Sequence, residues 1–172
     1  MNRCKRALVS VLALGLVAGA TVGVAAQDDP LEPASVTGTM TAPVREDGGS
    51  PELIEGFGMQ RQGQVWTNEW DTMDPRLNGT FRVLITVNAY SAQQMEVVNG
   101  VATLENDGGR WVGDFTMLDS GRAGTTGTLV LEGQDAYDGL TAYVVLDPRE
   151  STIGAAIFPG EMPPIPEAEA PA

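Results

Sequence analysis

The stretch 101–143 constrains the fold most, because it holds extended segments joined by a tight turn. The turn reads Asn106-Asp107-Gly108-Gly109, and these residue types accept the positive φ angles of a tight β-hairpin. One face of the segment that follows is apolar, and it carries Trp111, Gly113, Phe115 and Met117. Such alternation predicts a strand with one buried face.

Similar segments recur along the chain. The extended segments that we expect are 35–41, 57–70, 79–90, 95–105, 111–118, 125–133, 140–146 and 153–158. We expect a turn region at 43–51 and one short helical turn at 134–139 that ends at Gly139. About eight short strands without a long helical pattern predict an all-β fold, a single small antiparallel β-barrel, with a β-sandwich as the alternative. Glycines inside the strands favour the barrel, because closed sheets need sharp coiling.

The first 26 residues have the pattern of an export signal. A short basic segment (2–6) precedes an uncharged apolar run (7–26), and Val24-Ala25-Ala26 fits the small-residue rule for cleavage before Gln27. We therefore expect a cleaved signal peptide at 1–26, with an uncleaved membrane anchor as the alternative. The protein would then be secreted or held at the cell envelope, without membrane insertion after cleavage.

The remaining chain divides by composition. We expect a flexible leader at 27–34, one β-barrel domain at 35–160 and a disordered acidic, proline-rich tail at 161–172.

The charge balance excludes one class of partner. Three of the ten basic residues lie in the signal, so seven arginines remain against 23 acidic residues, a formal charge of −16. Such a chain repels nucleic acids and anionic membranes.

Residue types limit the chemistry further. The chain has no histidine, and its single cysteine, Cys4, lies in the signal. Histidine- or cysteine-based catalysis and zinc sites with these ligands are excluded, so we expect no catalytic residues, no metal and no cofactor. Glu69 and Asp71, with Asp74 near, are possible acid/base groups, but solvated surface acids are the simpler interpretation. The turn 106–109 is explained better by hairpin chemistry than by calcium binding.

Aromatic and charged residues suggest a ligand site. Trp66 and Trp70 could rim a barrel mouth, with Arg61 and Arg76 as polar anchors; ordinary core packing is the alternative. We interpret Trp111, Phe115 and Tyr137 as core. The full set of candidate ligand-binding residues is Arg61, Trp66, Glu69, Trp70, Arg76 and Arg82.

Three segments carry a resemblance to known proteins. They are Met-Asp-Pro-Arg-Leu-Asn-Gly-Thr (73–80), Glu-Asn-Asp-Gly-Gly-Arg-Trp-Val-Gly (105–113) and Gly-Gln-Asp-Ala-Tyr-Asp-Gly-Leu-Thr (133–141). The series resembles a group of exported bacterial β-barrel proteins of unassigned function, over about residues 56–160. This chain departs from the pattern of that group in three places. The order of the residues differs at 72–80, Gln134-Asp135 stands where the group has a glycine, and Asp138 stands where it has a glutamate. The last segment is also similar to one in allene oxide cyclase and dirigent barrels, which implies eight strands around a central cavity.

These observations predict an exported, non-catalytic barrel that binds a small apolar or amphipathic molecule or serves as an envelope interaction module. One alternative is a barrel enzyme of the cyclase or isomerase type, with Arg61, Glu69 or Arg82 as its buried ionisable group. Another is a purely structural surface module, which would have a solidly packed interior.

Overall fold

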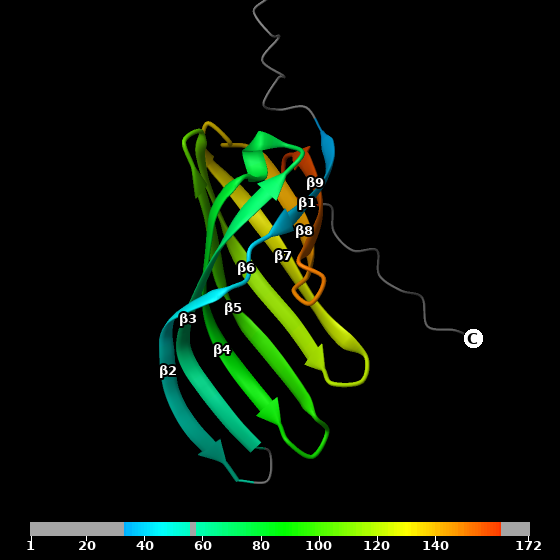
Figure 1. The fold of residues 1–172 in the computed structure, drawn as a ribbon. Helices are drawn as coiled ribbons and strands as arrows, with labels where there is room; N and C mark the ends of the chain where they lie inside the picture. Colours follow the sequence, from blue (N-terminus) through cyan, green and yellow to red (C-terminus); the bar gives the residue numbers. More distant parts are fainter. Residues whose placement is uncertain (1–32, 56–57, 163–172) are drawn as a thin grey trace, which may run out of the picture.

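The computed structural model describes residues 33–55 and 58–162 (Figure 1). The predicted signal peptide, nearly all of the leader and most of the predicted tail lie outside these residues. The nine strands are β1 (Ala34–Met40), β2 (Val44–Ile54), β3 (Gly58–Thr72), β4 (Gly79–Tyr90), β5 (Met95–Asn106), β6 (Gly109–Ser120), β7 (Gly124–Asp135), β8 (Leu140–Asp147) and β9 (Thr152–Pro159). One short 3-10 helix, η1 (Pro75–Leu77), lies between β3 and β4.

All the strand pairs are antiparallel and form one sheet in the order β1-β9-β8-β7-β6-β5-β4-β3-β2. An additional pairing between β1 and β3 closes eight of these strands into a ring, and β2 lies outside it. The predicted all-β architecture of about eight antiparallel strands is therefore confirmed, although the ring is not a regular barrel.

The irregularity arises at β3, which is 15 residues long and has two partners along one edge. Its last residues, 70–72, pair with β1, whereas 58–67 pair with β2. Only three register pairs join β1 to β3. We call this end, which also holds η1, the closed end, and the opposite end, with the turns 91–94 and 121–123, the open end. Figure 1 shows the long hairpins reaching the open end, beyond the shorter β8–β9 hairpin.

The inner face of the sheet forms the core. Alternate residues of β4 point inward, and Phe81, Val83, Ile85 and Val87 are each at most 8% exposed. Their cross-strand neighbours continue the apolar rows, for example Val83–Ala102–Gly113–Leu131. The predicted inward faces of 79–90 and 111–118 are thus confirmed, as is the core position of Trp111, Phe115 and Tyr137.

Two local predictions were wrong. Residues 44–51 of the expected turn region 43–51 belong to β2, because the first part of β3 supplies a hydrogen-bonding partner and pairing outweighs local turn preference. Gly49, at φ +65°, and Pro51 are tolerated because β2 is an edge strand. The expected helical turn at 134–139 is a non-helical turn after β7, although Gly139 has the left-handed conformation expected of it (φ +81°).

Candidate ligand-binding site

A cavity of about 210 Å³ lies against the inner face of the sheet, toward the open end, and we call it the inner-face cavity. Strands β3, β4, β5, β6 and β8 contribute to it, together with the end of β1. The lining residues are Met40, Pro43, Gln64, Trp66, Thr67, Asn68, Phe81, Val83, Ile85, Val87, Glu96, Val98, Phe115, Met117, Leu146 and Pro148. Most of these side chains are apolar, which is typical of a small-molecule site.

The cavity exists because β1 and β2 diverge from each other along β3. Pro43, in the crossing between them, lies on one side of the cavity, and Pro148, in the turn after β8, also lines it. A glycine also shapes the interior, since a Cβ at Gly127 would lie 3.2 Å from Cε2 of Phe115. The Phe115 ring therefore lies over a position without a side chain.

Trp66 forms part of the cavity wall and is held by its neighbours. Its Nε1 donates to Oε1 of Gln64 at 3.3 Å, and Gln64 in turn donates from Nε2 to the carbonyl oxygen of Gly48 at 3.3 Å. The guanidinium carbon of Arg45 lies 5.9 Å from the centroid of the Trp66 ring, within cation–π range. Gln64 is only 3% exposed, so this polar pair is fixed inside the wall.

Asn68 supplies a polar atom that lacks a partner. Its side chain is 8% exposed, and its Nδ2 donates to the carbonyl oxygen of Thr41 at 3.4 Å. Within the described chain, Oδ1 of Asn68 has no hydrogen-bond partner, and neither does Nε1 of the buried Trp70. The Trp70 ring stacks on Phe81 at 4.7 Å. A buried polar atom without a partner is costly. Of these two residues, Asn68 lines the cavity and Trp70 does not.

The open end carries charged groups. Glu96 lines the cavity and is exposed to solvent. Asp119 accepts hydrogen bonds from Nη2 of Arg149 at 2.8 Å and from Oγ1 of Thr125 at 2.9 Å. The Arg149 contact ties the β8–β9 turn to the end of β6.

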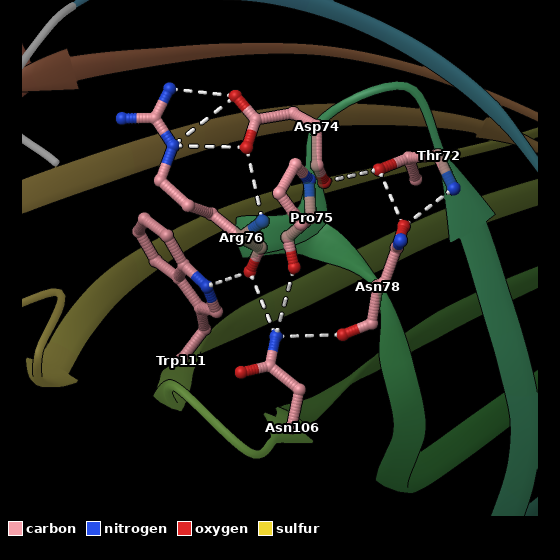
Figure 2. Close-up of polar contacts among 7 residues, drawn as sticks. All are labelled: Thr72, Asp74, Pro75, Arg76, Asn78, Asn106 and Trp111. Carbon is pink, nitrogen blue, oxygen red and sulfur yellow. Dashed lines mark hydrogen bonds and ion pairs between the residues drawn. The ribbon is translucent and has the colours of Figure 1, made fainter. Parts of the chain in front are cut away.

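The closed end is filled by η1 and the residues around it (Figure 2). Asp74 accepts from the Arg76 backbone at 3.0 Å, and its carboxylate lies 2.6 Å from Nη2 of Arg76. Burial raises the pKa of Asp74, but the hydrogen bonds and charge of Arg76 outweigh it, so that the pKa lies below its ordinary value. Thr72 Oγ1 lies 2.7 Å from the Asp74 carbonyl oxygen and 2.9 Å from Asn78 Oδ1.

Asn106 connects this helix to the rest of the barrel. Its Nδ2 lies 3.3, 3.2 and 2.8 Å from the carbonyl oxygens of Pro75, Arg76 and Asn78 (Figure 2). Its Oδ1 accepts from the backbone of Gly108 and Gly109 and from the Tyr137 hydroxyl at 2.7 Å. Asn106 is therefore a structural centre of the closed end and of the β5–β6 turn, as expected for hairpin chemistry.

Two aromatic rings complete the closed end. Nε1 of Trp111 donates to the Arg76 carbonyl oxygen at 2.8 Å, and its ring stacks on Tyr137 at 5.2 Å. Burial raises the pKa of Tyr137, and its hydrogen bond to Asn106 only partly opposes this. The three segments on which the sequence resemblance depends, 73–80, 105–113 and 133–141, thus meet in one cluster.

The six residues predicted to bind a ligand lie on both faces of the sheet and at different ends of the ring. Arg61, Trp66 and Trp70 lie on the inner face of β3, and Trp66 lines the cavity. Arg76 belongs to η1 at the closed end, whereas Arg61 lies in the part of β3 that pairs with β2, so the structure does not bring the two together.

Glu69 and Arg82 lie on the outer face. Glu69 accepts from Oγ1 of Thr80, and Arg82 is paired with Glu46 at 3.2 Å. Glu69 and Asp71 do share a face, and both are exposed.

Sequence reasoning missed Gln64 and Asn68 as lining residues. Both share the i, i+2 alternation of Trp66 and Trp70, which was the available signal. They were overlooked because polar residues on an inward face make an apolar pattern look irregular.

Across 33–55 and 58–162, no cluster of three or more acidic side chains is arranged to hold a metal ion. No helix in this part of the chain has the length and apolarity needed to cross a membrane. Comparison with protein-family models, curated proteins and solved structures finds no match to this chain.

Proposed function

We propose that this chain is an exported, non-catalytic binding protein that holds a small apolar or amphipathic molecule in the inner-face cavity. The observation that carries the proposal is an apolar cavity of about 210 Å³ lined in part by Asn68, whose buried Oδ1 has no partner among the described residues. The basic and apolar pattern of 1–26 supports export.

The cavity size indicates the size of the buried group. An engineered apolar cavity of about 150 Å³ accepts benzene, so a cavity of about 210 Å³ suits a compact group of roughly ten non-hydrogen atoms. A hydroxyl or amine on that group would donate to Asn68 Oδ1.

The lining favours binding over catalysis. Among the residues that line the cavity, Glu96 is the one ionisable group, and it is exposed to solvent. General acid–base catalysis works best with a group held near the substrate at a tuned pKa, and the described lining offers no buried one.

Calorimetric titration with 1-naphthol tests the proposal, because this molecule is a bicyclic apolar group with one hydroxyl donor. We expect saturable binding to the chain from residue 27 onward. Met117→Trp, which adds bulk in the cavity wall, should abolish it. Leu118→Trp is the matched control, since Leu118 is the next residue and is 46% exposed on the outer face.

The role of Asn68 has its own comparison. Asn68→Leu should weaken 1-naphthol binding while leaving naphthalene binding unchanged. Native mass spectrometry of protein purified from its own source would give the mass of the natural ligand. Absence of binding by 1-naphthol and by a lipid and metabolite panel, together with an adduct-free native mass, would overturn the proposal in favour of a structural module.

A further inference from the structure

The arginines of the chain fall into two groups. Four of the seven outside the signal are paired with carboxylates: Arg76 with Asp74, Arg82 with Glu46, Arg110 with Glu105 and Arg149 with Asp119. Among the described residues, Arg45, Arg61 and Arg122 have no carboxylate within ion-pair distance. In a chain with 23 acidic residues, unpaired arginines are unexpected.

Two of these arginines lie beside the inner-face cavity. Arg45 is the register partner of Trp66, and Arg61 is the register partner of Val87. Trp66 and Val87 both line the cavity, and directly opposed residues of an antiparallel pair point to the same face. Arg45 and Arg61 therefore start on the inner face, next to the part of the cavity wall formed by β3 and β4. Arg122 lies in the exposed β6–β7 turn.

Acidic groups on the inner face are positioned away from this wall. Glu96 lies on β5 opposite Ala89, and Asp119 lies on β6 opposite Glu96. Asp119 is already paired with Arg149, which leaves Glu96 as the unpaired acid among the lining residues. The unpaired positive groups, Arg45 and Arg61, thus lie on β2 and β3, and the unpaired negative group, Glu96, lies on β5.

We propose that the ligand is an anionic amphiphile, with its apolar part in the inner-face cavity and its anionic group bound by Arg45 and Arg61. This inference rests on the proposed binding function and adds the charge and orientation of the ligand. Guanidinium groups bind carboxylate, sulfate and phosphate oxygens through paired hydrogen bonds. Each such contact contributes about 1.5–3 kcal/mol, which corresponds to at least about tenfold in affinity.

The test compares three ligands with the same alkyl chain and different head groups: decanoate, decanol and decyltrimethylammonium. Calorimetric titration of the chain from residue 27 onward should give decanoate the highest affinity and decyltrimethylammonium the lowest. Arg45→Gln and Arg61→Gln should each weaken decanoate binding about tenfold and leave decanol binding unchanged. Glu96→Gln should strengthen decanoate binding by a smaller factor.

Arg82→Gln is the matched control, because it removes the same charge from the outer face of β4. Equal affinity for decanoate and decanol would overturn the anionic ligand and leave the binding function intact. Equal weakening by Arg82→Gln and Arg61→Gln would also overturn it, since a general field would then explain the preference. Failure of all three ligands to bind folded protein that still binds 1-naphthol would overturn the anionic amphiphile alone. Failure of 1-naphthol and of the ligand panel as well, with an adduct-free native mass, would overturn both proposals.

Discussion

At the scale of single residues, the closed end depends on side chains that replace backbone pairing. η1 is too short to satisfy its own carbonyl groups, so Nδ2 of Asn106 and Nε1 of Trp111 bind them instead. Asn106 also caps the β5–β6 turn through Oδ1. One side chain thus connects two loops that are separated by about thirty residues.

Asn106→Ala should lower the free energy of unfolding by about 3 kcal/mol, because it leaves several half-buried backbone groups and the Tyr137 hydroxyl without their partner. Urea unfolding measures this. Asn99→Ala is the control: Asn99 is exposed on the neighbouring part of β5 and accepts one long contact, from Thr116 at 3.5 Å. A change below about 0.5 kcal/mol is expected there, and a similarly small effect at Asn106 would contradict its structural role.

Asp74 should make stability depend on acid pH. Its pKa in the folded protein lies below the ordinary aspartate value, so its stabilising contribution is complete above the unfolded pKa and is lost as the pH falls through the folded pKa. The difference in unfolding free energy between the wild type and Asp74→Asn should therefore shrink between about pH 5 and pH 2. Urea unfolding across this range checks it, with Asp71→Asn as the control for losing one exposed carboxylate. A difference independent of pH would refute the ion-pair contribution.

At the scale of elements, the ring depends on the short contact between β1 and β3. Gly38 pairs with Thr72, and a Cβ at Gly38 would lie 2.6 Å from the Asp71 carbonyl oxygen and 2.7 Å from Cα of Thr72. These are backbone atoms, so they cannot move aside as a flexible side chain would. Close approach of β1 to β3 therefore requires glycine at position 38.

Gly38→Val should destabilise the fold by about 1–3 kcal/mol, because overpacking at the closure pushes β1 away from β3. Gly48→Val is the matched control, since a Cβ at Gly48 on β2 has no heavy atom within 4 Å. We expect the control to be neutral within about 0.5 kcal/mol. Thermal unfolding of both variants gives the comparison, and equal effects would show that valine itself, rather than the closure, is responsible.

At the scale of the whole molecule, closure at one end and divergence at the other give the domain its two distinct parts. The closed end is filled by η1, Trp111 and Tyr137, and its polar groups bind one another. The open end leaves the inner face accessible, because β2 leaves β1 and the β8–β9 hairpin is short. The network of η1, Trp111 and Tyr137 thus lies at one end, and the candidate site lies toward the other.

The three segments of the sequence resemblance illustrate this division. Segments 73–80, 105–113 and 133–141 build the closed end through Arg76, Asn106 and Tyr137. The residues that line the cavity lie mostly elsewhere, on β3, β4 and the second half of β6. These three segments therefore close the fold, and they leave the chemistry of the cavity open.

The sequence by itself determined most strand positions, the inward faces of β4 and β6, and the hairpin at 106–109. These features depend on the period-two alternation and on turn chemistry, which are local properties of neighbouring residues. The absence of histidine, and of any cysteine besides Cys4, likewise limits the chemistry without any structure.

Tertiary structure decided the rest. The segment 43–51 became a strand because β3 offered it an edge, and Asn68 became a lining residue because β1 and β2 diverge beside it. The separation of Arg61 from Arg76 and the pairing of Arg82 with Glu46 also follow from which strands meet. Contacts between residues far apart in the chain leave no periodic signal, so the cavity and the strands that surround it can be identified only from the closed sheet.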